Sequence, residues 1–260
     1  MLLRYWRCGL ALAILSVSVG VTARADDVVK VGIYYPQVPP YMYKPRDGGA
    51  VQGLIPDLLN RFFQQTAFTV RYIEENRQRA ELKLYAGDID IMVLSEKWSQ
   101  QPDQLLYSLP VLTHRDYLYS LTSDELQPLD QLQDKTICLR RHYVYTGLQQ
   151  ALHNGRLLRL NANSEFDQMN MLVNGRCDFA YLNEHVAQWL TTNYFSAVDL
   201  YRSDYTVDET GMTLALHKKW QALLPQLNAF LLQASETGET ATLLQQHIGA
   251  SSKGSIVKPE

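Results

Sequence analysis

The chain has 260 residues, of which 46 % are hydrophobic and 20 % are charged, with 14 Gly and 10 Pro. This composition excludes a disordered, collagen-like or low-complexity chain, and the length predicts one large domain or two modest ones. The formal net charge is −3, and without the three arginines of the first 25 residues it is −6 (21 basic against 27 acidic residues), which argues against nucleic acid or an anionic membrane as the binding partner.

The first 25 residues have the pattern of a cleaved secretory signal peptide. Arg4 and Arg7 precede an apolar run over 10–21, and Ala23-Arg24-Ala25 matches an A-x-A cleavage site. The run is only about 12 residues long, short of the roughly 20 that span a bilayer, so a retained membrane anchor is the weaker interpretation. We therefore expect an exported, soluble chain that begins at residue 26.

After the signal, the apolar pattern alternates between strands and helices. The β-branched run over 28–35 predicts a buried strand, and apolar residues at helical spacing predict a helix over 54–63. The pattern continues with a strand over 68–73, a helix over 79–86 and a strand over 89–94. This order predicts a parallel α/β sheet with right-handed crossovers.

The alternation then restarts and builds a second unit. The expected strands are 117–121, 135–140, 157–160 and 178–182, and the expected helices are 145–153, 166–173 and 184–191. Beyond them we predict a strand over 211–216, an amphipathic stretch over 218–234 and a helix over 240–247. The tail over 250–260 has no periodicity, and we expect it to be flexible.

Cys138 and Cys177 are the cysteines that remain once the signal is removed. An oxidising compartment would allow them to pair. Both fall on predicted strands of the second unit but at different heights, and a bridge requires Cα atoms within about 7 Å. This placement favours two buried free thiols, with a disulfide as the alternative.

The sequence motifs of common enzymes and metal sites are absent from this chain. It has no G-x-G-x-x-G, Walker P-loop, G-x-S-x-G or H-E-x-x-H pattern. The six histidines form no i,i+4 pair, and adjacent side chains such as Glu184 and His185 point apart on a helix. We therefore expect no catalytic residue, no metal site and no cofactor.

Several segments, in order along the chain, resemble motifs of the family 3 periplasmic solute-binding proteins. Residues 39–43 (Pro-Pro-Tyr-Met-Tyr) with Gly53 and Asp57 resemble the opening of that family, 80–90 resembles its "a-L-x-x-G-x-x-D" signature, and 107–111 resembles its passage into the hinge. Further segments that resemble its later motifs are 132–139, 173–180, 216–219, 227–228 and Gly238. The resemblance spans nearly the whole mature chain.

The resemblance implies a periplasmic-binding-protein-like fold of type II, in which two α/β lobes are joined by a two-strand hinge. Lobe 1 would comprise 26–113 and 209–249, and lobe 2 would comprise 114–208. Ligands of open α/β sheets bind where the strands end at their carboxyl side, so the solute site is expected between the lobes, which would close around it.

This chain departs from the family pattern at the positions that hold an amino acid. The "T-x-x-E-R" arginine that binds the ligand carboxylate has no equivalent in 95–102, and the "G-T-T" turn is replaced by 142–145. The amine-binding aspartate corresponds to Asn183, whose neutral amide cannot pair with an ammonium group as a carboxylate does. A standard zwitterionic amino acid is therefore disfavoured as the ligand.

Basic and aromatic side chains at the predicted strand ends are the expected ligand-binding set instead. Arg79 and Tyr143-Val144-Tyr145 also resemble motifs of a divergent branch of the family. Each member has an ordinary alternative role, such as a solvated helix start for the arginines or packing for the rings. The set is Tyr34, Tyr35, Tyr41, Arg77, Arg79, Ser95, Lys97, Trp98, Arg140, Tyr143, Tyr145 and Asn183.

The resemblance implies a monomeric periplasmic protein that delivers a small polar solute, amino-acid-like or anionic, to an inner-membrane ABC permease. Two alternatives stay open. One is an enzyme resembling cyclohexadienyl dehydratases, for which Glu96 or Glu184 would be the general acid. The other is a solute-sensing module that acts on a separate membrane receptor.

Overall fold

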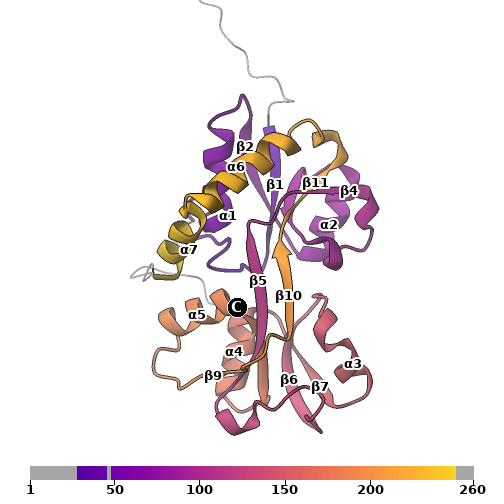
Figure 1. The fold of residues 1–260 in the computed structure, drawn as a ribbon, viewed down its shortest axis with the longest axis vertical. Coiled ribbons are helices and arrows are strands. Elements are labelled where there is room, and N and C mark those ends of the chain that lie inside the picture. Colours follow the sequence, from indigo (N-terminus) through magenta and orange to yellow (C-terminus); the bar gives the residue numbers. More distant parts are fainter. Residues whose placement is uncertain (1–27, 46–47, 250–260) are drawn as a thin grey trace, which may run out of the picture.

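The computed structural model describes residues 28–45 and 48–249, and these form two lobes (Figure 1). Strands β5 (Leu112–Ser120) and β10 (Asp208–Met212) run side by side between the lobes. The predicted α/β class, with two lobes joined by two strands, is confirmed. The predicted signal peptide and the predicted flexible tail lie outside the described residues.

The first lobe is built on a mixed sheet with the strand order β2-β1-β3-β11-β4. These strands are β1 (Val28–Tyr34), β2 (Thr69–Glu75), β3 (Ile91–Val93), β4 (Leu105–Tyr107) and β11 (Leu214–His217). Strand β1 pairs in parallel with β2 and β3, whereas β11 pairs antiparallel with β3 and β4. The helices of this lobe are α1 (Leu54–Phe63), α2 (Arg77–Ala86), α6 (Leu224–Glu236) and α7 (Glu239–Gly249).

The second lobe is built on a sheet with the strand order β10-β5-β8-β6-β7, and β9 (Tyr201–Arg202) pairs with β5. The remaining strands are β6 (Lys135–Arg140), β7 (Leu157–Ala162) and β8 (Phe179–Asn183). The helices are α3 (Gln149–His153), α4 (Glu165–Val173) and α5 (Glu184–Asn193). Helix α5 contacts α7 of the first lobe, so the two lobes also meet beside the crossing strands.

The crossing strands are longer and more divided than the sequence pattern predicts. Strand β5 begins five residues before the predicted strand 117–121, because Leu112–Asp116 pair with β10. The predicted strand 211–216 is two strands, since β10 belongs to the second sheet and β11 to the first. Thr213 lies between them and bonds to Leu94 of the first lobe through its carbonyl and its hydroxyl. The short strand β4 was not predicted.

In each lobe an aspartate binds the first half of one strand, Asp90 that of β1 and Asp178 that of β6; Asp90 is buried and Asp178 is half-buried. Asp90 accepts hydrogen bonds from the Lys30 amide at 2.7 Å and from the Trp220 indole at 2.9 Å, and it pairs with Lys219 at 2.6 Å. In lobe 2, Asp178 accepts from the amide and the hydroxyl of Thr136, both at 2.6 Å. The aspartates of the two "G-x-x-D" motifs therefore organise the sheets.

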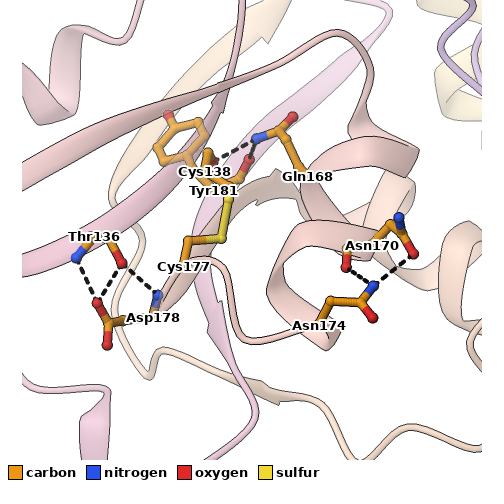
Figure 2. Close-up of a disulfide and its surroundings, with 8 residues drawn as sticks. All are labelled: Thr136, Cys138, Gln168, Asn170, Asn174, Cys177, Asp178 and Tyr181. Carbon is orange, nitrogen blue, oxygen red and sulfur yellow. Dashed lines mark hydrogen bonds between the residues drawn. A yellow bond between two sulfur atoms is a disulfide. The ribbon is translucent and has the colours of Figure 1, made fainter.

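The cysteines form a disulfide, and the preference for free thiols was wrong (Figure 2). In the parallel register of β6 and β8, Cys138 lies opposite Ala180. Cys177 precedes β8 in the turn after α4, which brings its Cα within 5.9 Å of the Cα of Cys138. The predicted strand 178–182 is nearly correct, but the cysteine sits on the connecting turn and not at another height of the sheet.

Acid should destabilise the fold through carboxylates that accept strong hydrogen bonds. Burial alone would raise the pKa of Asp178, but the bonds from Thr136 and the charge of Lys135 lower it. Burial likewise opposes a lowered pKa at Asp208, which accepts from Lys97 and Thr146. Because these folded-state pKa values lie below the unfolded value of about 3.9, the stabilisation is complete above that pH and is lost as the pH falls through the folded values.

We therefore expect the free energy of unfolding to fall as the pH drops from about 5 towards 2. Urea unfolding across this range, with Asp178→Asn as the test variant, measures the effect. The variant should be less stable than the wild type at pH 7, and the two should converge at low pH. The exposed Asp88→Asn is the control. Curves that stay parallel for Asp178→Asn and the wild type would refute this assignment.

Candidate functional site

A cavity of about 100 Å³ lies between the lobes, where strands of both sheets end. Lobe 1 contributes Tyr34, Val38, Tyr41, Met42, Arg77, Val93 and Trp98, and the crossing strands contribute His114, Asp116 and Met212. Lobe 2 contributes Tyr143, Val144, Tyr145, Glu165, Gln168, Tyr181, Leu182, Asn183 and Val186. Aromatic rings and aliphatic groups dominate this lining, so the cavity suits a small organic solute.

Part of the predicted ligand-binding set converges on this cavity. Its members in the lining are Tyr34, Tyr41, Arg77, Trp98, Tyr143, Tyr145 and Asn183. Tyr35, Arg79, Ser95, Lys97 and Arg140 lie outside it. The Tyr35 side chain is 59 % exposed, Arg79 pairs with Glu75 at 2.8 Å, and Ser95 donates to the carbonyl of Gly211 at 2.5 Å.

Arg77, at the start of α2, lines the cavity but has its charge compensated within lobe 1. It pairs with Glu81 one turn along the helix, at 3.2 Å, and both side chains are buried. A second nitrogen of the guanidinium donates to the carbonyl of Trp98 at 2.5 Å. The arginine therefore supports the loop that carries Trp98, whose ring forms one wall of the cavity.

Arg140 is 3 % exposed and lies behind the cavity wall. Its guanidinium contacts both carboxylate oxygens of Glu165 at 2.6 Å and stacks on the ring of Tyr143 at 4.6 Å. Burial alone would lower the pKa of Arg140, but Glu165 raises it, so the group stays charged. Arg140 also donates to the carbonyl of Pro36, which joins lobe 2 to lobe 1.

Asn183 caps α5 and makes a second contact between the lobes. Its side-chain oxygen accepts from the amide of His185 at 2.9 Å and from the Tyr41 hydroxyl of lobe 1 at 2.5 Å. Its amide nitrogen donates to the carbonyl of Arg115 at 2.9 Å. Tyr41 also lies 2.9 Å from His185 Nδ1, and burial lowers the pKa of that imidazole. With its groups engaged in this way, Asn183 links lobe 2 to Tyr41 of lobe 1.

The carboxylate and the imidazole on strand β5 were missed as site residues. Asp116 accepts from His114 Nε2 and from the Tyr181 hydroxyl, both at 3.1 Å. Burial, followed by the charge of Asp116, raises the pKa of Tyr181. The two residues share a face because alternate side chains of a strand do. The spacing of His114 and Asp116 was a usable signal, but the predicted strand began after both of them.

Two polar atoms of the lining are buried without a hydrogen-bond partner among the described residues. They are the hydroxyl of Tyr143 and Nδ1 of His114. Buried polar groups are normally hydrogen-bonded, and a free one is costly. These atoms are the groups of the cavity that a bound solute would satisfy.

The carboxylates proposed as general acids lie away from this cavity. Glu96 is exposed in the 3₁₀ turn Glu96–Trp98, and Glu184 lines a separate hollow beside α5. The carboxylates in the main lining are Asp116 and Glu165. Across residues 28–45 and 48–249, no group of three His, Cys, Asp or Glu is arranged to hold a metal ion. In the same ranges, no helix has the length and apolarity needed to cross a bilayer.

Solved structures with the same architecture cover most of this chain. AbpA from Streptococcus pneumoniae, described as an amino acid ABC transporter substrate-binding protein bound to L-arginine, is 18 % identical with a TM-score of 0.71, covering 86 % of this chain and 95 % of its own. The ancestral protein AncCDT-1, described as a precursor of cyclohexadienyl dehydratase, is 17 % identical with a TM-score of 0.68 and coverages of 86 % and 96 %. A histidine kinase sensor domain is 16 % identical with a TM-score of 0.71 and coverages of 85 % and 96 %.

These likenesses show the fold, which is the predicted periplasmic-binding-protein-like fold. A search of curated proteins found no match. The sequence profile of one family, in contrast, matches residues 29–250, which is most of the chain and includes strands and helices of both lobes. The chain therefore belongs to the bacterial extracellular solute-binding proteins, family 3.

Proposed function

We propose that this protein is exported to the periplasm and captures a small polar solute between its lobes for delivery to an ABC permease. The observation that carries the proposal is the cavity lined from both lobes, with two buried polar atoms that lack partners among the described residues. A cavity shared by two lobes is completed only on closure, so binding and closure are coupled. The description of AbpA as an amino acid ABC transporter substrate-binding protein supports delivery to a transporter.

A thermal-shift screen of small solutes tests the capture step. A ligand present at 100 times its dissociation constant should stabilise the protein by roughly 2.7 kcal/mol, or about 5–10 °C in melting temperature for a chain of this size. Trp98→Ala, which removes one wall of the cavity, should reduce the shift. Leu82→Ala, on the 53 % exposed side chain of α2, should leave it unchanged. If no solute of a broad library shifts the melting temperature, the proposed function is wrong.

The enzymatic alternative has one point in its favour, the likeness to a precursor of cyclohexadienyl dehydratase. A general acid must present a proton to the substrate. Here the carboxylates of the cavity accept hydrogen bonds instead, Asp116 from Tyr181 and Glu165 from Arg140. We therefore expect no turnover of prephenate or arogenate. The sensory alternative is tested by whether a permease or a receptor is retained by the solute-loaded protein from envelope extract.

A further inference from the structure

The cationic side chains in and beside the cavity are committed to carboxylates of the protein. Arg77 pairs with Glu81, Arg140 with Glu165, and Lys97 with Asp208. In the first two pairs the arginine is less than a tenth exposed. Water therefore cannot readily take the place of its carboxylate partner, and loss of that partner would destabilise the protein. A carboxylate on the solute would have to displace one of these partners, and the displaced carboxylate would stay buried.

The buried carboxylate of Asp116 determines whether Nδ1 of His114 donates or accepts a hydrogen bond towards a solute. The carboxylate oxygens accept hydrogen bonds, so the proton of a neutral His114 ring lies on Nε2, 3.1 Å from Asp116 Oδ1. Nδ1 is then an acceptor, and it is buried with no partner among the described residues. It needs an N–H or O–H donor, and the adjacent negative charge of Asp116 disfavours an anion.

Aromatic rings of the cavity, two of them beside the His114 ring, limit the shape of a solute that reaches this acceptor. The Trp98 ring stands edge-to-face with the His114 ring at 5.2 Å, and the Tyr41 ring lies at 6.1 Å. The Tyr143 ring lies at 6.3 Å from that of Tyr34 and carries the second unpartnered group, its hydroxyl. Flat apolar groups pack well against such rings, and cations are attracted to their faces.

We propose that the cavity selects a neutral or cationic aromatic solute without a carboxylate, and that His114 Nδ1 is the acceptor for its amine, amide or hydroxyl group. This inference rests on the proposed function, because it names the class of solute that the cavity captures. The sequence predicted an anionic or amino-acid-like solute. The proposed solute instead carries a hydrogen-bond donor for His114 Nδ1 and no carboxylate.

Matched pairs of small probes test this selection by isothermal titration calorimetry at pH 7.5. The pairs are benzylamine against benzoate and tyramine against 4-hydroxyphenylacetate, which share a ring and differ in charge and in donor groups. The amine of at least one pair should bind at least tenfold more tightly than its carboxylate. Tighter binding of the carboxylates would overturn the inference but leave the proposed capture function standing.

Variants of His114 separate the acceptor from general packing. His114→Gln keeps a donor towards Asp116 but loses the Nδ1 acceptor, so affinity for the amine should fall at least tenfold. His114→Asn places an oxygen near the Nδ1 position and should retain more of the affinity than His114→Gln. Equal affinities in the wild type and His114→Gln would overturn the role of Nδ1. The circular dichroism and melting temperature of each variant establish that it is folded.

The solute screen of the preceding subsection covers the case in which none of the four probes binds. A hit without a carboxylate that loses affinity in His114→Gln would support the inference. A hit that carries a carboxylate, or that binds His114→Gln as well as the wild type, would overturn it. A screen without any hit would instead remove the proposed function itself, so the two failures are distinguishable.

Discussion

Replacing Cys138 and Cys177 together by serine should lower the free energy of unfolding by about 4 kcal/mol. The bond closes a loop with a sequence separation of 39 residues, and in the chain-entropy description a loop of this length restricts the unfolded chain by about that amount. The bond ties β6 to the turn after α4, inside the core of lobe 2 (Figure 2). The loss should therefore appear as a lower urea midpoint.

Reduction provides the control for the cysteine variants. Dithiothreitol should lower the stability of the wild type to a value close to that of the double serine variant, and it should leave the variant itself unchanged. If the oxidised wild type and the double variant unfold at the same urea concentration, the disulfide does not stabilise the native state and the expectation fails. The fluorescence of both proteins at zero denaturant establishes a common starting state.

Glu165→Ala should cost about 3–5 kcal/mol, because it leaves the buried guanidinium of Arg140 without its carboxylate. The double variant Arg140→Met, Glu165→Leu removes both charges and should recover much of that loss. Urea unfolding of the two variants measures the difference. Lys44→Ala breaks an ion pair whose side chains are 37 % and 36 % exposed, and it should change stability by less than about 1 kcal/mol.

The comparison between the single and double variants is the decisive one. If Glu165→Ala is no less stable than the double variant, the buried charge of Arg140 finds another partner. In that event Arg140 would be available to a solute, as first expected from its place at the end of β6. If Glu165→Ala loses much stability and the double variant regains it, Arg140 has a structural role in the cavity wall and does not bind the solute.

The alternation of apolar strands and helices was enough to predict the α/β class, and the order of the motifs was enough to predict two lobes. Local patterns succeeded where an element is buried within its own lobe, on one face in α1 and on both faces in β1. They failed at β10 and β11, because one extended segment is divided between two sheets by pairing with distant strands. Such pairing leaves no mark in the local sequence.

The candidate site was predictable only in part for a related reason. The rings converge because strands of both sheets end at the cavity, as Tyr34 at the end of β1 and Tyr143 after β6 show. Whether a charge is free to bind a solute depends on its partner in space. Glu165 neutralises Arg140 from 25 residues away, and Asp208 neutralises Lys97 from 111 residues away. Residue type and position alone could not distinguish these compensated cations from ligand-binding ones.

The route of the chain also sets an order in which the lobes can be completed. Strand β11 lies between β3 and β4, so the sheet of lobe 1 cannot close until residues 214–217 have been delivered. Apart from β10 at its edge, the sheet of lobe 2 is supplied by a continuous stretch that includes both cysteines. During synthesis from the N-terminus, the strands of lobe 2 other than β10, and both cysteines, are therefore available before lobe 1 has the last strand of its sheet. The order of the chain thus allows lobe 2 to fold before lobe 1 is completed.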